Sequence, residues 1–301
     1  MATPQGVPAE KPEVRVTILE TGKVQIRPSM RSQTADRLVL LRRLVSLSDR
    51  QWTAPLPITA ILIDHPEGPF LFDTGESVHR NDPGYFPRWM PFSRILAKVH
   101  IKHDEGIGAR LQARGVNPGD IKGVILSHLH DDHAGGLNYL PGVPVYLSQT
   151  HWDIFKHRFH ATFEGCCPAR WPANFSPRLL EAKDHPIGPW KQTYPLTSDG
   201  RDVAVDTPGH VPGHVSVIVY GDEATYFLTG DAMYRLDLLD AEETDGVNDN
   251  PTVALESVRK IKEFARQSDV VILVAHDPDV ENCLAERKVF IPSVRPSVIK
   301  S

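Results

Sequence analysis

The feature that most constrains this chain is the segment 127–133, Ser-His-Leu-His-Asp-Asp-His, which follows the apolar run 123–126. It places three imidazoles and a pair of carboxylates within six residues, from His128 to His133. A regular strand or helix would spread these side chains over opposite faces. The segment therefore predicts a sharp turn at the end of a strand, where the side chains can converge.

These side chains are metal ligands of the borderline-to-hard class, which suits zinc first, with iron, manganese or cobalt as alternatives. Asp132 and His133 are adjacent, so they cannot easily serve the ion that His128 and His130 bind. We therefore expect two divalent metal ions that share one short loop. The alternative interpretation is a histidine-rich surface loop without a metal.

Composition limits the class of protein. The chain has 301 residues with 41% hydrophobic and 24% charged residues, which is ordinary for a globular α/β protein. A net charge of -5 argues against a nucleic-acid partner. No apolar run reaches the roughly 18 residues that span a bilayer, so we expect no membrane partner. Residues 1–12 contain no hydrophobic signal region, which predicts a disordered lead and a cytoplasmic protein.

The cysteines do not form a disulfide framework, because Cys166, Cys167 and Cys283 are few and odd in number. The adjacent pair Cys166-Cys167 could hold a metal or form a redox bridge. No second cysteine pair completes such a site, so we interpret them as free thiols in a loop.

Strands and helices alternate along the chain. Residues 14–19 and 23–27 predict a hairpin around Thr21-Gly22, and 57–64 and 69–73 a second hairpin that ends in Asp73. Helices are expected at 105–114, 149–158 and 251–267, and further strands at 143–147, 203–206, 215–220, 225–229 and 270–274.

We expect one domain over residues 13–301, with insertions at about 77–105 and 159–200. Both insertions are rich in aromatic residues and lack a clear period. Insertions of this length in a compact domain are usually functional or disordered. Their aromatic side chains would build an apolar substrate pocket or, alternatively, ordinary core.

Three further metal-capable residues occupy the same kind of position as the first cluster. His210 lies in a turn rich in proline and glycine before a strand, Asp231 follows an apolar strand, and His276 follows another. Side chains at strand ends gather at one edge of a sheet, where functional loops lie.

The full series resembles the ligand set of the metallo-β-lactamase superfamily: His128, His130, Asp132, His133, His210, Asp231 and His276. The resemblance implies an α/β fold, the αβ/βα four-layer sandwich, with the metals at one edge between two sheets. It also implies that His128, His130 and His210 hold one ion, that Asp132, His133 and His276 hold the other, and that Asp231 bridges them. Asp73 would orient a ligand, and His214 has no ligand role.

Within the superfamily the chain is most similar to the N-acyl homoserine lactonases. These enzymes place a tyrosine three residues after the bridging aspartate, as Tyr234 follows Asp231 here, and the stretch 65–75 also fits them. Two-zinc β-lactamases usually carry a thiol at the position of Asp231, and oxygen-reducing di-iron members a carboxylate at that of His130. Nucleases of the superfamily usually add a further domain.

The resemblance implies a dinuclear hydrolase that acts on a small-molecule lactone, for instance an N-acyl homoserine lactone, or on a related lactam. A hydroxide between the two ions would attack the ring carbonyl, Asp132 would move the proton and Tyr234 would stabilise the oxyanion. We expect a monomer or a homodimer. The alternatives are a thioester hydrolase similar to glyoxalase II and a non-catalytic, metal-stabilised binding protein.

Overall fold

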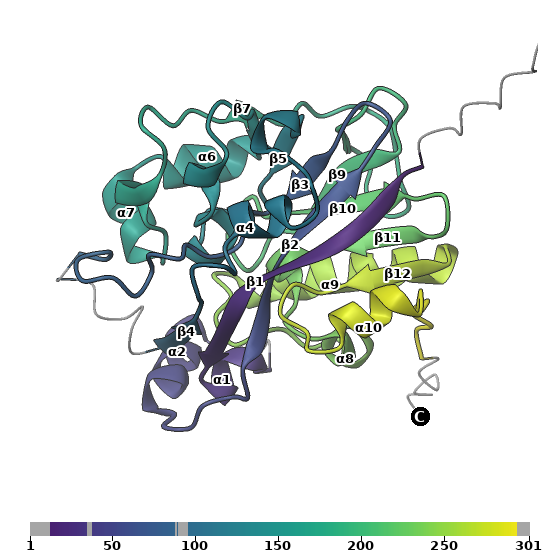
Figure 1. Ribbon diagram of the computed structural model, residues 1–301. Coiled ribbons are helices and arrows are strands. Elements are labelled where there is room, and N and C mark those ends of the chain that lie inside the picture. Colours follow the sequence, from purple (N-terminus) through teal and green to yellow (C-terminus); the bar gives the residue numbers. More distant parts are fainter. Residues whose placement is uncertain (1–12, 35–37, 88, 90–95, 294–301) are drawn as a thin grey trace, which may run out of the picture.

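The computed structural model describes residues 13–34, 38–87, 89 and 96–293. The expected disordered lead at 1–12 lies outside these residues. Two β-sheets face each other and carry helices on their outer sides (Figure 1). Among the described residues, no helix is both long and apolar enough to cross a bilayer.

The first sheet has seven strands in the order β4-β1-β2-β3-β5-β6-β7. Neighbours from β4 to β3 pair antiparallel, and β3, β5, β6 and β7 pair parallel. Its strands are β1 (Arg15–Ile26), β2 (Leu56–Asp64), β3 (Phe70–Phe72), β4 (Ala97–His100), β5 (Gly123–Ile125), β6 (Val145–Leu147) and β7 (Arg178–Leu179).

The second sheet has five strands in the order β12-β11-β10-β9-β8, with only the β11–β12 pair parallel. Its strands are β8 (Tyr194–Pro195), β9 (Asp202–Asp206), β10 (Val215–Tyr220), β11 (Thr225–Leu228) and β12 (Val270–Leu273). This sheet is built from the second half of the chain, and no strand ladder of the described residues joins it to the first sheet.

The α-helices of the described residues, in chain order, are α1 (Pro28–Arg31), α2 (Val39–Ser48), α4 (Ile107–Gln112), α5 (Asp131–Ala134), α6 (Gln149–Phe155), α7 (Arg158–Phe163), α8 (Leu236–Ala241), α9 (Pro251–Gln267) and α10 (Val280–Ala285). Short 3-10 helices lie at η1 (Pro118–Asp120), η2 (Leu137–Tyr139), η3 (Pro168–Arg170) and η4 (Gly230–Ala232).

Three hydrophobic clusters separate the four layers. The inner faces of both sheets form the first, where Ile61 of β2 belongs to the same cluster as Val217 of β10. Helices α4 to α7 pack on the outer face of the first sheet through residues such as Phe155. Helices α8 and α9 pack on the outer face of the second, around Phe227. Because side chains of a strand alternate between faces, Leu62 of β2 joins the outer cluster beside Ile61 of the inner one. This is the expected αβ/βα four-layer sandwich.

The first predicted hairpin is wrong. Residues 15–26 form one strand, β1, whose register against β2 shifts between Glu20 and Lys23. Thr21-Gly22 is therefore a β-bulge, not a turn, and Gly22 has φ of 115°. A strand partner on both sides explains the difference, since β2 and β4 together pair along the whole length of β1. The second hairpin, β2–β3, is confirmed.

Candidate metal centre

The segment 127–133 leaves the carboxyl end of β5 and turns directly into the short helix α5. His128 and His130 stand before this helix, and Asp132 and His133 stand in its first turn. Because the chain changes from extended to helical at this point, the side chains of His128 and His130 point in a different direction from those of Asp132 and His133. The sharp turn predicted from the sequence is therefore present.

The other predicted residues come from the second half of the chain. His210 lies between β9 and β10, Asp231 lies in η4 directly after β11, and His276 follows β12. Gly230 makes the approach of η4 possible: its φ is 54°, and a β-carbon there would lie 2.7 Å from Cβ of Ser127. Only glycine can adopt this positive φ without a side chain that would collide with Ser127.

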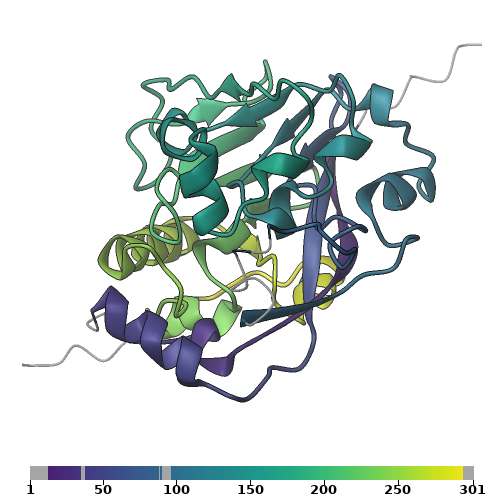
Figure 2. The same cartoon turned by 90° about the vertical axis from the view of Figure 1, so that its left-hand side faces the viewer.

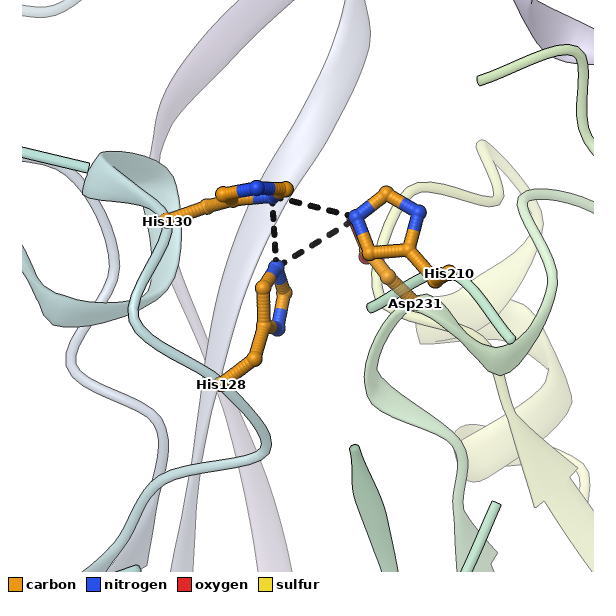
Figure 3. Close-up of side chains that lie close together, drawn as sticks. All are labelled: His128, His130, His210 and Asp231. Atoms are coloured by element: carbon orange, nitrogen blue, oxygen red, sulfur yellow. Dashed lines mark hydrogen bonds and ion pairs between the residues drawn. The ribbon is translucent and has the colours of Figure 1, made fainter. Parts of the chain in front are cut away.

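Three ring nitrogens converge on one point (Figure 3). Nδ1 of His130 is 2.9 Å from Nε2 of His128 and 3.0 Å from Nε2 of His210. A tetrahedral zinc ion with bonds of about 2.0–2.1 Å separates two nitrogen ligands by roughly 3.3 Å. The triangle is therefore close to the size that an ion requires.

A second group lies on the other side of Asp231. Nε2 of His133 and Nε2 of His276 are 3.1 and 3.2 Å from Oδ1 of Asp231. Oδ2 of Asp231 faces the first group instead, 3.4 Å from Nε2 of His210 and 4.0 Å from Nε2 of His128. Asp132 completes the second group, with Oδ2 3.6 Å from Nε2 of His276. The two oxygens of one carboxylate thus face two separate sets of donors.

Unpaired buried atoms show that this arrangement suits a metal pair. Nε2 of His133 and Oδ1 of Asp231 are only 3.1 Å apart, yet neither atom has a hydrogen-bond partner among the described residues. Buried polar atoms without a partner are costly, and they are rare in native proteins. Atoms that lie close but aim at a shared point, instead of at each other, are arranged as the donors of a metal site are.

The second nitrogens of three of the rings are held by the protein. Nδ1 of His133 donates to Oδ2 of Asp73 at 2.8 Å, as the sequence predicted for Asp73, and Nδ1 of His276 donates to the carbonyl of Pro57 at 2.8 Å. Ser127 Oγ lies 2.9 Å from Nδ1 of His128 and donates to Asp73. Each of these contacts leaves the other ring nitrogen as a lone-pair donor toward the centre.

The electrostatics hold three of the donors, His128, His130 and Asp231, in their metal-binding forms, whereas burial is outweighed by nearby carboxylates, which raise the pKa of His133, His210 and His276. Burial lowers the pKa of His130 to about 3 and, with the neighbouring His133, holds the pKa of His128 well below its usual value. Both rings are therefore neutral near pH 7. Burial raises the pKa of the Asp231 carboxyl, but His133 and His276 outweigh it and leave that pKa well below the usual value, so Asp231 is a carboxylate.

Tyr234 stands over the junction of the two groups. Its ring centroid is 5.9 Å from that of His210 and 5.3 Å from that of His276. Burial, and then the charge of Asp231, raise the pKa of its hydroxyl well above 10, so it remains a phenol that can donate a proton. Asp132 is partly exposed, with 28% of its side chain accessible to solvent. All eight site residues predicted from the sequence therefore lie together.

Three residues stand around the donors: His214 was expected as a supporting or core histidine, whereas His151 and Asp245 were not predicted. The first is His151 of α6, which is fully buried. Its Nδ1 donates to the carbonyl of Pro212 at 2.8 Å, and its Nε2 accepts from the backbone N–H of Leu129 at 3.0 Å. One imidazole thus joins the loop of His128 and His130 to the loop of His210. Burial lowers its pKa to about 4, so the neutral form that both bonds need persists near pH 7.

His214 does the same for Asp231. Its Nε2 accepts from the backbone N–H of Asp231 at 3.0 Å, and its Nδ1 lies 2.9 Å from Oγ1 of Thr207. Both ring nitrogens of His214 are therefore engaged by the protein, which agrees with the expectation that it is not a ligand. The third residue, Asp245, lies close to the site, with Oδ2 3.9 Å from Nδ1 of His210, within ion-pair range but too far for a hydrogen bond. Sequence alone gave no sign of His151 or Asp245, because both act through contacts made on folding.

Both predicted insertions contact this region. Arg80 and Tyr85, from the first, donate to the Asp131 carboxylate of α5 at 3.0 and 3.1 Å. Gly165, from the second, lies against the ring of His130. The aromatic residues divide between the two uses that the sequence left open. Trp171, Phe175 and Trp190 pack into the hydrophobic clusters, whereas Trp89, Phe159 and Phe163 are exposed. Phe92 lies outside the described residues.

Cys166 and Cys167 are free thiols, as expected, and both are buried. Burial raises the pKa of Cys167 to about 12 and that of Cys166 well above its usual value. A thiol in this form is neither a nucleophile nor a good metal ligand. The structure therefore gives no support to a role for this pair in the chemistry.

Comparison with known proteins identifies the family. The model of the metallo-beta-lactamase superfamily matches residues 53–276. The N-acyl homoserine lactonase of Bacillus thuringiensis is 29% identical over 229 residues, which cover 75% of this chain and 83% of that protein. The N-acyl homoserine lactonase AttM of Azorhizobium caulinodans is 30% identical over 233 residues, with 74% and 83% covered.

Solved structures show the same fold. An N-acyl homoserine lactone hydrolase, with the product N-hexanoyl-L-homoserine at its catalytic metal centre, aligns with a TM-score of 0.72 at 23% identity. The alignment covers 90% of this chain and 96% of that one. A probable metal-dependent hydrolase from Staphylococcus aureus aligns with a TM-score of 0.67 at 17% identity, covering 89% and 91%.

The His151 contacts predict an effect on metal affinity. Replacing His151 with alanine leaves the Leu129 N–H and the Pro212 carbonyl without partners, at a cost of about 1–3 kcal/mol for each group. We expect metal affinity, measured by competition with a chelating dye, to fall about 10–100-fold. His151→Gln should restore part of the loss, since an amide offers one donor and one acceptor.

The matched control is His157→Ala, which removes an exposed histidine at the N-terminal end of α7. It should bind metal as the unaltered protein does. Equal affinity in the His151→Ala and His157→Ala variants would contradict the role given to His151.

Proposed function

From the premise that this chain belongs to the metallo-β-lactamase superfamily, we propose that it is a dinuclear metal-dependent hydrolase that opens the ring of a lactone. An N-acyl homoserine lactone is the first candidate substrate, and a related lactam the second. Two curated relatives that cover about three quarters of the chain are N-acyl homoserine lactonases. The chain also has Tyr234 three residues after Asp231, the spacing described above for N-acyl homoserine lactonases.

One observation carries the proposal: Asp231 and Tyr234 stand at the junction of two donor groups. Asp231 presents one oxygen to each group. Tyr234 lies beside a histidine of each, His210 and His276. A single-ion site would not need a shared carboxylate, and a binding site without chemistry would not need a buried phenol over the junction.

We assign His128, His130 and His210 to one ion, Asp132, His133 and His276 to the other, and Asp231 to both. Zinc is the first choice because neutral imidazoles predominate, with iron, manganese or cobalt as alternatives. A pair of divalent cations bound there lowers the pKa of water and polarises a carbonyl oxygen, so that hydrolysis can proceed near neutral pH.

The residues of the chain then divide the remaining work. The phenol of Tyr234 donates a hydrogen bond to the carbonyl oxygen of the lactone as negative charge develops on it. Asp132 is the partly exposed carboxylate of the site, and it carries the proton from the attacking water to the leaving ring oxygen. Asp73, His151 and His214 hold the loops in place, so that these two groups meet the substrate in one geometry.

The proposal predicts substrate preference. Protein loaded with metal should open N-acyl homoserine lactones, and ring opening can be followed by the proton it releases. A panel of lactones with different tails, a lactam and S-lactoylglutathione separates the candidates. Turnover of the thioester alone would support a thioester hydrolase similar to glyoxalase II, and absence of turnover on the whole panel would support a binding protein.

The proposal also predicts two ions per chain. Elemental analysis at saturation should find two, and chelation should lower the stability of the fold. A ligand that binds only the folded state, at a concentration 1,000 times its dissociation constant, stabilises it by about 4 kcal/mol. Thermal melts with and without chelator, followed by return of zinc, measure this effect. Saturation at one ion per chain would contradict the dinuclear assignment.

Tyr234→Phe tests the phenol. The variant removes one donor to the oxyanion and leaves the ring packing, so we expect kcat for lactone opening to fall by up to about 100-fold. Metal content and KM should change little. Tyr220→Phe, at the end of β10, is the control and should keep full activity. An unchanged kcat in Tyr234→Phe would remove this residue from the mechanism.

A further inference from the structure

Helix α2 buries its polar side and exposes its apolar side. Its buried residues are Arg42 and Ser46. Its leucines face outward, with 69% of Leu40 exposed and about half of each of three others, and the preceding Leu38 is exposed as well. The exposed leucines are Leu38, Leu40, Leu41, Leu44 and Leu47. A surface helix of a monomeric protein normally shows the reverse arrangement.

The inverted orientation is fixed by contacts of the buried side. The Arg42 guanidinium donates to the carbonyls of Thr34 and Asp245 and to Oγ1 of Thr244. The Gln33 amide donates to the Arg42 carbonyl at 3.2 Å and to Oγ of Ser46 at 3.3 Å. Turning the helix over would leave a buried arginine without these partners, so the leucines must point outward.

The apolar surface continues beyond α2. Arg43 of α2 pairs with Glu164 at the end of α7, at 3.4 Å, which brings α7 beside it. Helix α7 exposes Phe163 and Phe159, and the Phe159 ring stacks on Trp89 with centroids 5.5 Å apart. Figure 2 looks onto this side of the molecule, with α2 at the lower edge. We call the five leucines and these three aromatic residues the α2–α7 face.

We propose that the α2–α7 face binds the same face of a second copy of this chain, so that the protein is a two-fold symmetric homodimer. The spacing of Leu40, Leu44 and Leu47 is i, i+4, i+7, the pattern of a helix seam that packs against another helix. A second copy supplies a helix with that same pattern. Two-fold pairing is also the commonest form of protein self-association.

The size of the face agrees with this occupant. A stable interface takes about 800 Å² from each partner, and homodimer interfaces are about 65% apolar. At the exposures given above, five leucines and three aromatic side chains offer roughly 450–800 Å² of apolar surface. Exposed apolar patches larger than a few hundred Å² are unusual on monomers.

Charge argues against a lipid surface as the occupant. Helices that lie on membranes carry lysine and arginine along an exposed polar side. The two arginines of α2 are used otherwise: Arg42 is buried, and Arg43 pairs with Glu164. The net charge of -5 adds no attraction to anionic lipid.

The dimer would act on the metal centre through the buried side of α2. Arg42 holds the carbonyl of Asp245, and the carboxylate of Asp245 faces Nδ1 of His210. Burial of the leucines by the second copy would restrict the motion of α2 and of Asp245, which lies beside His210. This inference does not depend on which bond the enzyme cleaves.

Light scattering coupled to size exclusion tests the proposal on the full chain. The unaltered protein should have twice the mass of the 33.6 kDa chain. Leu40→Glu with Leu44→Glu should give a monomer with the same circular dichroism. Ile291→Glu is the matched control, because Ile291 is 83% exposed outside this face, and it should remain a dimer.

A second variant does not depend on how well the charged protein folds. In a two-fold pairing of α2, the two copies of Leu44 approach each other near the middle of the helices. Leu44→Cys should therefore form a covalent dimer on mild oxidation, whereas Ile291→Cys should not, and the three native cysteines are buried. A monomeric unaltered protein, a dimer that survives the double substitution, or monomers that float with lipid vesicles would each overturn the proposal.

Discussion

The structure depends on one carboxylate that is shared between two sets of histidines. Asp231 directs Oδ2 toward His128 and His210 and Oδ1 toward His133 and His276. Each set combines residues from the first half of the chain with residues from the second. No strand ladder of the described residues joins the two sheets, so the inner hydrophobic cluster, the donor groups and single hydrogen bonds such as that from the Val215 N–H to the Ser127 carbonyl hold the halves together.

Buried histidines that contact no metal position fix this arrangement. His151 and His214 each accept a backbone N–H through Nε2 and donate through Nδ1, and burial keeps their pKa values low. A neutral imidazole is suited to this task because it offers one donor and one acceptor on opposite sides of a rigid ring. The histidines near the centre thus have two tasks. Some direct a ring nitrogen into a donor group, and His151 and His214 hold the backbone that carries those donors.

The sequence predicted the fold, and the residues that gather at the candidate metal centre, because their signals are local. The spacing of 128–133 requires a turn by itself, and a polar residue directly after an apolar strand can be recognised at Asp231 and His276. Thr21-Gly22 misled the prediction because a bulge and a hairpin use the same residues, and only the partners β2 and β4 decide between them. His151, Asp245 and the inverted side of α2 were not predicted, since each depends on which surface packs against which.

Position 73 combines two demands that seldom coincide. Its backbone has φ of 60°, which branched and bulky residues avoid and which aspartate and asparagine tolerate. Its side chain accepts from the backbone and hydroxyl of Ser127 and from the His133 ring, so every neighbour is a donor. Asparagine would satisfy the backbone but bring an N–H group to a place where only acceptors fit. Glutamate would carry its carboxylate one methylene farther along, away from the positions that these donors fix. A substitution at position 73 therefore gives up either the left-handed backbone or a hydrogen bond that holds the loop of His128 and the ring of His133.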